Sequence, residues 1–374
     1  MDISALVQLD ARSGIQRVVR SILREWLNHP PVGYRIEPVY ATVDQGYRYA
    51  RRFIQAFLGC PDRAMQNEAM KYAPDDVFLG LDLQPYVVAA HQTFYQELRR
   101  RGVQVKFVVY DLLNVLMPQY FPPESAQDFT RWLEVVAEND GALCISKVVA
   151  DELADWVNEH GPARQRPFMI DWFHIGADVG SSVPTKGLPS GADGVLDQLR
   201  SRRSFIMVGT IEPRKGHAQA LEAFEQLWQS GVDVNLVIIG QQGWMVESLI
   251  EHLREHPELN KRLFWLEGIS DEYLEKVYVA STCLIAASYG EGFGLPIIEA
   301  AQHKLPIIAR DIPVYHEVAG EHAYYFEAKT PAALAQAFKT WFILHNVQQH
   351  PKSNRLPWQT WKESARQLSK IILP

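Results

Sequence analysis

The stretch SYGEGFGLPIIEAAQHKLPIIARD, residues 288–311, decides the fold. It follows CLIAAS (283–288), an apolar run with the length of a buried strand. Three glycines between residues 290 and 294 then predict a turn, and Pro296 stands at the first position of a predicted helix. Such a turn lets backbone N–H groups approach a ligand, and the helix N-terminus favours an anion. The stretch therefore predicts a phosphate site on an α/β fold.

Two carboxylates flank this turn. Glu291 stands in the glycine-rich loop, and Glu299 stands eight residues later, in the first turn of the predicted helix. At that separation both would flank one spot and accept hydrogen bonds from sugar hydroxyls. The alternative is that the glycines only make a turn and that Glu299 only complements the helix dipole.

Short apolar runs alternate with helical patterns along the rest of the chain. The runs are apolar on both faces, as buried parallel strands are, and residues 216–231 and 271–281 carry apolar side chains at helical spacing. The expected strands are YRIEPVYA (34–41), DDVFLGLDL (75–83), QVKFVVYDLL (104–113), GALCIS (141–146), FMIDWFHI (168–175), RSFIMVGTI (203–211), VNLVIIG (234–240), RLFWLEGI (262–269), CLIAAS (283–288) and LPIIAR (305–310). This alternation predicts parallel sheets covered by helices.

The length of 374 residues predicts two domains. The stretch 176–194 is rich in Gly, Ser and Pro and is interpreted as the linker between them. The predicted parts are an N-terminal Rossmann-like domain (1–178), a C-terminal Rossmann-like domain (179–350) and a C-terminal segment (351–374). The helix Trp358–Ile372 of that segment is expected to cross back to the first domain, anchored by Trp361 and Leu368.

Composition excludes several classes of protein. The chain is 47% hydrophobic and 22% charged, as globular proteins are, and its net charge of −7 argues against nucleic-acid binding. Three separated cysteines favour a reducing compartment without disulfides. The apolar runs are too short to span a bilayer, and the N-terminus lacks the pattern of a signal peptide. We therefore expect a cytoplasmic protein, and the short run before the first loop leaves open a longer or multidomain natural chain.

A pair of cations precedes the glycine-rich loop by about seventy residues. In MVGTIEPRKGH (207–217), Arg214 and Lys215 follow the first strand of the second half, at the sheet edge where ligands bind. Adjacent cations suit a leaving diphosphate. The alternative is a solvated Arg-Lys pair before a helix.

Together these motifs resemble the retaining glycosyltransferases of family 4, which have the GT-B fold of two doubly wound domains facing a cleft. The resemblance rests on EGFGLPIIE (291–299) with GTIEPRKGH, IIGQQGW and LEGISDEYLEKVY in the expected order. DARSGIQRVVRSIL (10–23) and TWKESARQL (360–368) are similar to the branch rich in bacterial mannosyl- and rhamnosyltransferases that build O-antigen polysaccharides. The resemblance covers nearly the whole chain, and it implies that the N-terminal domain (1–178) binds the acceptor and the C-terminal domain (179–350) binds the nucleotide-sugar donor.

The resemblance implies roles for the donor site. Glu291 would contact the hydroxyls of the donor sugar, Glu299 the ribose, and Arg214 with Lys215 the diphosphate. The remaining donor contacts that it implies are Gly14, Thr210, Gly240, Trp244, Gly268, Ile269, Gly292, Phe293, Gly294 and Leu295. Relatives usually carry an Arg where Thr210 follows Gly209, so more of the binding would fall to Arg214.

In the first half, Asp111 is expected near the reacting centre as a polar contact that receives the acceptor's proton; the alternative is that it caps the next helix. Tyr110 replaces the His of many relatives and, with Arg17, is assigned to the acceptor. Eight arginines lie between residues 12 and 52, interleaved with aromatic residues. This face is expected to meet a lipid-diphosphate acceptor or the inner membrane, unless it is a plain solvated helix face.

The expected reaction transfers a hexose, foremost mannose from GDP-mannose, to a sugar hydroxyl of a lipid-linked polysaccharide with retention of configuration. The sequence shows no convincing enzyme nucleophile and no clustered metal ligands, so we expect no metal or other cofactor. The alternatives are a rhamnosyl- or other hexosyltransferase, a nucleotide-sugar 2-epimerase, and a non-catalytic partner in a polysaccharide-synthesis complex.

Overall fold

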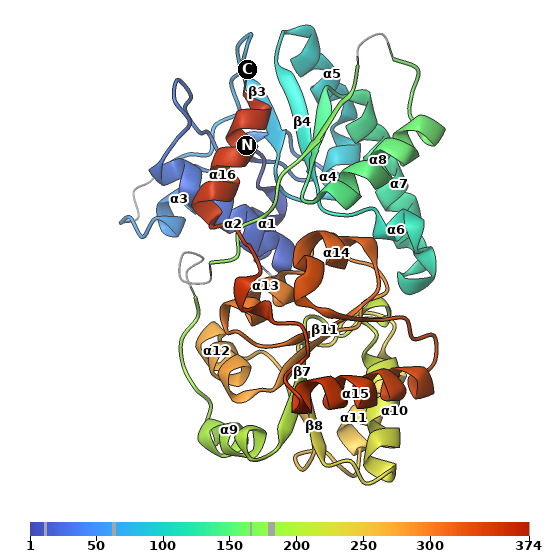
Figure 1. Ribbon diagram of the computed structural model, residues 1–374. Helices are drawn as coiled ribbons and strands as arrows, with labels where there is room; N and C mark the ends of the chain where they lie inside the picture. The colour runs from blue at the N-terminus through green and yellow to red at the C-terminus, as the bar shows by residue number, and fades with distance from the viewer. Residues whose placement is uncertain (11–12, 62–64, 165–166, 179–183, 374) are drawn as a thin grey trace. The chain divides into compact units, whose positions relative to one another are not determined.

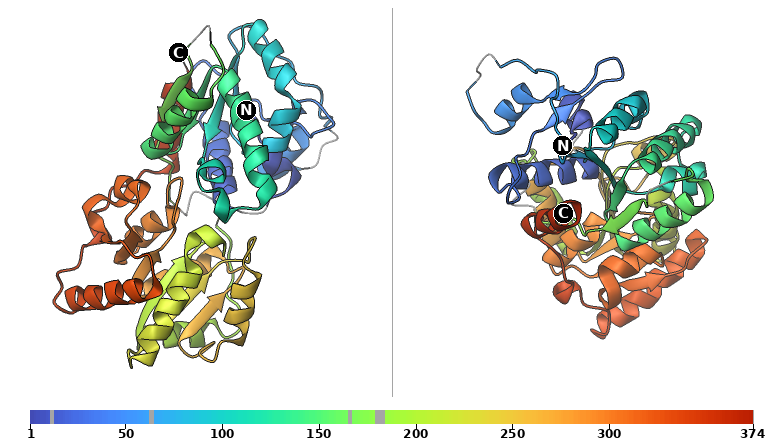
Figure 2. Two further views of the ribbon diagram at one scale, coloured as in Figure 1. Left: turned by 90° about the vertical axis from the view of Figure 1, so that its right-hand side faces the viewer. Right: turned by 90° about the horizontal axis from the view of Figure 1, so that it is seen from above.

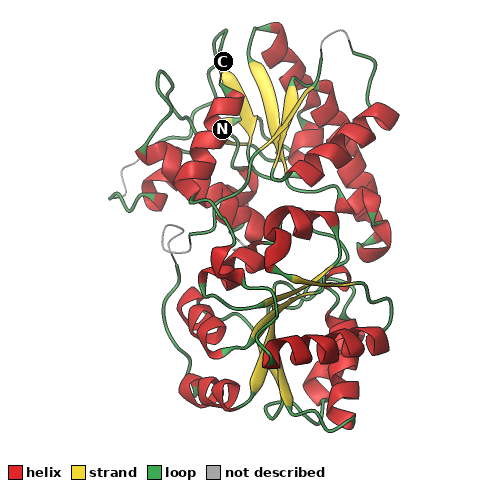
Figure 3. Ribbon diagram, viewed as in Figure 1, coloured by secondary structure: helices red, strands yellow, loops and turns green. Residues whose placement is uncertain are grey.

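The computed structural model describes residues 1–10, 13–61, 65–164, 167–178 and 184–373. The chain divides into two units, each built around a parallel sheet (Figure 3). The N-terminal unit consists of Met1–Leu116, Pro123–Ser182 and Gln359–Pro374, and the C-terminal unit consists of Met117–Pro122 and Val183–Trp358. The α/β class predicted from the sequence is confirmed.

The sheet of the C-terminal unit has its parallel strands in the order β12-β11-β10-β7-β8-β9. The strands are β7 (Arg203–Val208), β8 (Val234–Ile239), β9 (Leu263–Leu266), β10 (Cys283–Ala286), β11 (Ile307–Arg310) and β12 (Tyr324–Phe326). The order reverses at β7, where Leu284 of β10 pairs with Ile206. In open α/β sheets, ligands bind at such a reversal, beyond the carboxyl ends of the strands. The topology thus makes neighbours of the loops after β7 and β10.

Helices cover both faces of this sheet (Figures 1 and 2). One face packs against α10 (His217–Gln229), α11 (Glu247–Glu255) and α15 (Pro331–Asn346), whose apolar residues join those of the strands in one buried core. The helices that accompany the other face are α9 (Ala192–Ser201), α12 (Asp271–Ala280), α13 (Leu295–Gln302) and α14 (Pro313–Ala319). Short 3₁₀ turns span Pro118–Tyr120, Pro213–Lys215, Gly320–His322 and Ser353–Arg355.

The sheet of the N-terminal unit has the order β3-β4-β5-β6, all parallel. Its strands are β3 (Val77–Gly80), β4 (Gln104–Val109), β5 (Gly141–Cys144) and β6 (Met169–Trp172), and a separate antiparallel pair is formed by β1 (Val39–Tyr40) and β2 (Arg48–Tyr49). Asp2 bridges Gly80 on one side and Val39 on the other. The direction of winding therefore reverses at the start of the chain, as in a doubly wound sheet.

The helices of this unit again lie on two faces. A core forms between the sheet and α4 (Pro85–Ala90), α5 (Gln92–Arg100), α7 (Pro123–Glu138) and α8 (Lys147–His160). The other helices are α1 (Ser4–Gln8), α2 (Gly14–Asn28), α3 (Arg51–Phe57), α6 (Leu113–Leu116) and α16 (Trp361–Ile372). Figure 1 shows α16 beside α2, and the Trp26 indole N–H donates to the Ala365 carbonyl at 3.2 Å. On the sheet, Lys106 Nζ donates to the Ile372 carbonyl at 2.7 Å.

Several boundaries differ from the sequence-based expectations. Only Val39 and Tyr40 of the expected strand 34–41 are in a strand, and the helix α1 lies before Gly14. The expected linker 176–194 overlaps α9 at its end, and the expected boundary at 178/179 reaches residues outside those described. The last helix begins at Trp361, where Thr360 caps it through a capping box with Glu363, and both expected anchors are buried there.

Candidate active site

Three charged side chains meet at the carboxyl ends of β7 and β10. The Arg214 guanidinium lies 3.1 Å from Glu291 Oε2 and donates to the Gly290 carbonyl at 3.0 Å, and Lys215 Nζ pairs with Glu291 Oε1. Glu212 adds a second carboxylate, 2.6 Å from Arg214. The side chains of Arg214, Lys215 and Glu291 are only 11–15% exposed. The structure thus brings together three of the residues that the sequence assigned to the donor.

Electrostatics in this ion cluster keep Glu291 ionised. Burial alone would raise the pKa of its carboxyl, but the charges of Lys215 and Arg214, aided by hydrogen bonds from Lys215 and Ser288, lower that pKa to about 2. Ser288 Oγ donates to Oε1 at 2.7 Å. The Glu291 carboxylate therefore pairs with both Arg214 and Lys215. An incoming diphosphate would share or displace those contacts.

Two glycines give the cluster its local geometry. Gly216 (φ +74°) precedes α10, and a Cβ there would lie 2.5 Å from the Ala287 carbonyl oxygen. Gly294 (φ +97°) precedes α13, and a Cβ there would lie 2.9 Å from the Tyr315 ring. Only glycine tolerates this combination of backbone conformation and close packing. The glycine-rich loop therefore folds tightly over the neighbouring elements.

The other residues of this loop lie around the start of α13. Gly292, Phe293 and Gly294 are buried, and Leu295 is the first residue of α13. Glu299 is the fifth helical residue and not part of the first turn; it is buried and accepts a hydrogen bond from the Tyr278 hydroxyl at 2.8 Å. The recorded contacts thus join Glu291 and Glu299 to different partners.

The loop after β7 packs against the loop after β8. A Cβ on Gly240 would lie 1.9 Å from the Gly209 carbonyl oxygen, and one on Gly243 would lie 2.9 Å from the Thr210 methyl. Trp244 donates its indole N–H to the Tyr120 carbonyl at 2.9 Å and stacks on Phe121. Thr210 and Gly240 therefore lie where these two loops pack together, and the contact of Thr210, Gly240 and Trp244 with a donor stays a prediction.

Gly268 and Ile269 lie in the loop between β9 and α12. Gly268 (φ +59°) is exposed, and Ile269 is half-buried just before Ser270, the N-cap of α12. Gln241 is the residue that a Cβ on Gly268 would meet, at 3.7 Å. The structure places this pair beside the loop after β8, and their contact with a base stays a prediction.

A cavity of about 20 Å³ lies beneath the ion cluster, lined among others by Lys215, His217, Glu291 and Tyr315. That volume accommodates about one water molecule. The Nδ1 atom of His217 is buried and has no hydrogen-bond partner among the described residues. Burial, with the charge of Lys215, lowers the pKa of His217 to about 3, so its ring is neutral. In the sequence His217 stands out only by its position after the Arg-Lys pair, which does not predict its burial.

In the N-terminal unit, Asp111 follows β4 and accepts a hydrogen bond from the Leu113 backbone N–H at 3.1 Å, so it does cap α6. Burial, and then the negative charge of Asp111, raises the pKa of Glu152 on α8 to about 7. Glu152 was not predicted, because only the fold places α8 near the end of β4. Tyr110 is 3% exposed and donates its hydroxyl to the Leu81 carbonyl at 2.7 Å. This placement favours a packing role for Tyr110 over contact with an acceptor.

Gly14, which the resemblance assigned to the donor, lies at a helix terminus. Gly14 is the first residue of α2, and Ser13 caps the helix in a capping box with Gln16. Gly14 is exposed with open space beside it, and Arg17 is half-buried one turn later. The residues just before this cap, 11–12, lie outside the described residues.

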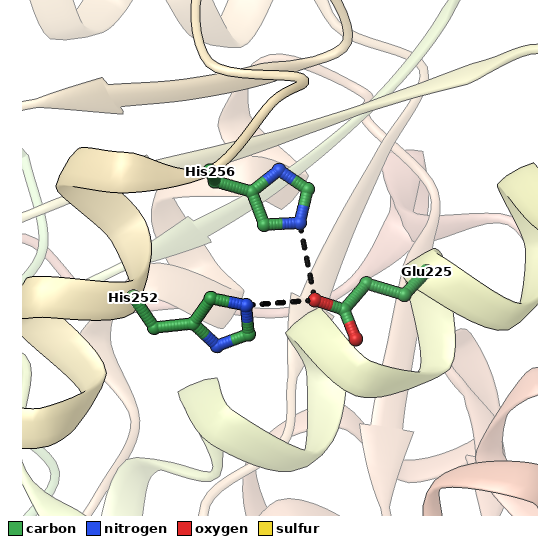
Figure 4. Close-up of side chains that lie close together, drawn as sticks. All are labelled: Glu225, His252 and His256. Atoms are coloured by element: carbon green, nitrogen blue, oxygen red, sulfur yellow. Dashed lines mark hydrogen bonds and ion pairs between the residues drawn. The ribbon is translucent and has the colours of Figure 1, made fainter.

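A separate group of potential metal ligands lies on α10 and α11. Figure 4 shows His252 and His256 pointing at Glu225, each with its Nε2 atom 3.1 Å from Oε1. His256 Nδ1, however, accepts a hydrogen bond from the Glu258 backbone N–H at 3.1 Å. The proton of the neutral ring is then on Nε2, where it donates to Glu225 and leaves no lone pair for a metal. The cluster is explained as a hydrogen-bonded link between two helices.

Comparison with known sequences identifies proteins to which this chain is similar. Residues 198–355 match the family model described as glycosyl transferases group 1. The whole chain is 45% identical, over 380 residues, to the Escherichia coli protein named serotype-specific mannosyltransferase WbdA, and it spans 45% of the length of that relative. The E. coli protein named O-antigen chain mannosyltransferase B is 30% identical over 125 residues, which are 33% of this chain and 32% of that one.

Solved structures extend the likeness to the fold of the whole chain. Anabaena HepE in complex with UDP and glucose matches 96% of this chain and 92% of its own, with a TM-score of 0.61 and 13% identity. The OtsA apo structure matches 80% of this chain and 74% of its own, with a TM-score of 0.59 and 15% identity. The fold is that of the GT-B glycosyltransferases, and within it residues 198–355 are similar to the glycosyl transferases group 1 family.

Proposed function

We propose that the protein is a retaining mannosyltransferase that moves mannose from GDP-mannose to a sugar hydroxyl of a growing lipid-linked O-antigen polysaccharide. The proposal rests on one observation above all, the pair of nearly buried cations that Glu291 holds at the reversal of the C-terminal sheet. The similarity to WbdA, which extends over the whole of this chain and 45% of that relative, supports mannose as the sugar.

The chemistry that this site can provide is stabilisation of a leaving group. The bond between the anomeric carbon and the diphosphate oxygen breaks, and a bond from that carbon to the acceptor oxygen forms. The acceptor's proton passes to the departing diphosphate on the same face, so configuration is retained. Arg214 and Lys215 would neutralise the charge that builds on the diphosphate, in a site that largely excludes water.

The carboxylates would orient the donor. Glu291 is ionised and can accept hydrogen bonds from sugar hydroxyls, while Glu299, held by Tyr278, would accept from the ribose. In Glu299→Ala we expect GDP to bind at least tenfold more weakly by calorimetry. Unchanged GDP affinity would remove the ribose role.

Transfer from GDP-mannose to a lipid-linked saccharide tests the proposal directly. We expect Arg214→Ala and Lys215→Ala each to lower the rate by 10²–10³-fold, the loss seen when one preorganised donor is removed from a transition state. Lys261→Ala and Arg262→Ala, an adjacent pair in the same unit, should leave the rate unchanged. Full activity of both site variants would contradict the diphosphate assignment.

Further experiments distinguish the proposed reaction from the alternative mechanisms and functions. NMR of the product gives the anomeric configuration, and an inverted linkage would contradict the retaining mechanism. Activity that EDTA abolishes would contradict the proposed metal independence. Conversion of the donor without any acceptor would indicate a 2-epimerase, and absence of donor turnover would indicate a non-catalytic partner.

We also propose that the N-terminal unit meets the anionic acceptor or the cytoplasmic face of the inner membrane. None of the described helices is long and apolar enough to cross a membrane. On α3, Phe53 and Phe57 stack 5.8 Å apart beside the exposed Arg52. Flotation with anionic vesicles tests this contact, and Arg52→Glu should weaken it. Equal flotation of both proteins would contradict the role of this face.

A further inference from the structure

Arg310, the last residue of β11, is a buried cation whose recorded partners are all neutral. It is 7% exposed. Its guanidinium donates to the carbonyl oxygens of Ala287 and Ala328, at 2.9 Å each, and to Gln219 Oε1 at 2.6 Å. No ion pair joins it to a carboxylate among the described residues. A buried charge without a counter-ion is costly, so its presence calls for a physical reason.

Two of the three acceptors, Ala287 and Gln219, lie in segments that carry the ion cluster. Ala287 directly precedes the loop with Ser288 and Glu291, and Gln219 is the third residue of α10, just after Lys215. The Arg310 guanidinium therefore forms a fork that holds the loop after β10 against the first turn of α10. The planar guanidinium can donate in several fixed directions, which a lysine ammonium cannot reproduce.

Tyr289 completes the link. The Arg310 guanidinium carbon lies 4.0 Å from the centre of the Tyr289 ring, and the Tyr289 hydroxyl donates to Gln219 Oε1 at 3.2 Å. The Tyr289 backbone N–H donates to the Arg214 carbonyl at 2.8 Å. Tyr289 thus connects Arg310 with the backbone of Arg214 on the opposite loop.

We propose that Arg310 is a positioning residue of the donor site, which fixes the two loops that hold Arg214, Lys215 and Glu291 and adds a positive charge whose counter-ion is the bound diphosphate. This inference rests on the donor role proposed above. Because arginine stays protonated in proteins, the charge is present at every working pH. A diphosphate bound nearby would offset the cost of burying it, so the charge favours diphosphate over a ligand with less negative charge.

The test compares Arg310→Met and Arg310→Lys with the wild type, using GDP and GMP as probes in calorimetry and mannose transfer for kcat and KM. Arg262→Met is the control, because Arg262 lies in the same unit, pairs with Glu258 at 2.8 Å and stands over the Trp228 ring. Loss of the Arg262 side chain should leave GDP binding and kcat unchanged.

We expect Arg310→Met to weaken GDP by about tenfold and GMP by less than threefold. Arg310→Lys should restore GDP affinity to within threefold of the wild type, because the charge returns, while its kcat stays at least fivefold low, because the fork does not. Equal weakening of GDP and GMP in Arg310→Met, or a wild-type kcat in Arg310→Lys, would overturn the proposal. If Arg310→Met does not fold, Arg310→Lys decides alone through kcat.

GDP binding and mannose transfer by the wild type distinguish a failure of this inference from a failure of the proposed function. If the wild type neither binds GDP nor transfers mannose, the proposed donor is wrong. If the wild type is active and both Arg310 variants behave like Arg262→Met, only the role of Arg310 is wrong.

Discussion

The ion cluster makes a quantitative prediction for Glu291→Gln. The substitution keeps the size of the side chain and removes the charge that balances Arg214 and Lys215. In the folded protein the pKa of Glu291 falls from 4.5 to about 2, which corresponds to about 3 kcal/mol in favour of the carboxylate. We therefore expect the free energy of unfolding of the C-terminal unit to fall by about 3 kcal/mol at pH 7.

The pH dependence identifies the cause of this loss. A carboxyl whose pKa is lower in the folded than in the unfolded state contributes stability above the unfolded value of 4.5, and that contribution is lost as the pH falls toward 2. The difference between wild type and Glu291→Gln should therefore be constant from pH 7 to about 5 and should narrow to roughly half at pH 3.

Urea unfolding followed by tryptophan fluorescence measures this difference. The control is Glu258→Gln, which breaks the pair of Glu258 with Arg262, where both side chains are about a quarter exposed. That change should cost less than about 1 kcal/mol. The role of the ion cluster is contradicted if Glu291→Gln lowers the free energy of unfolding no more than the control does at pH 7. It is also contradicted if the decrease in Glu291→Gln is the same at pH 3 as at pH 7.

Three other substitutions test separate parts of the structure. In Gly240→Ala the new Cβ would meet the Gly209 carbonyl oxygen at 1.9 Å, so donor turnover should fall at least tenfold, whereas Gly194→Ala, with open space, should not change it. Trp361→Ala should destabilise the N-terminal unit by about 3–5 kcal/mol in urea unfolding, since this side chain is 1% exposed. Burial raises the pKa of Asp82 from 3.8 to about 7, so wild-type stability should fall as the pH rises from about 4 to 7. Asp82→Asn should lack that slope, and an equal slope in both proteins would contradict the assignment.

Local patterns in the sequence determined most of the secondary structure and pointed to several residues of the candidate site. Runs such as VNLVIIG became β8 because four to eight doubly apolar residues can be buried only inside a covered sheet. The turn before α13 was also predicted from the sequence, because glycine adopts the left-handed backbone conformation that such turns need and Pro296 favours the first turn of a helix. Chemistry alone suggested a diphosphate for Arg214 and Lys215 and sugar hydroxyls for Glu291, and the family resemblance assigned all three to one donor.

Only the tertiary structure decided which of these residues meet. Arg214 and Glu291 are 77 residues apart, and they pair because the sheet places β10 beside β7 and not beside β9. The same long-range packing buries Tyr110, leaves His217 Nδ1 without a partner among the described residues, and places Glu152 near Asp111. It also turns Arg310, an ordinary strand end in the sequence, into a link between two loops. Local periodicity carries no information about such neighbours, because strand order and side-chain burial depend on the free energy of the whole folded unit.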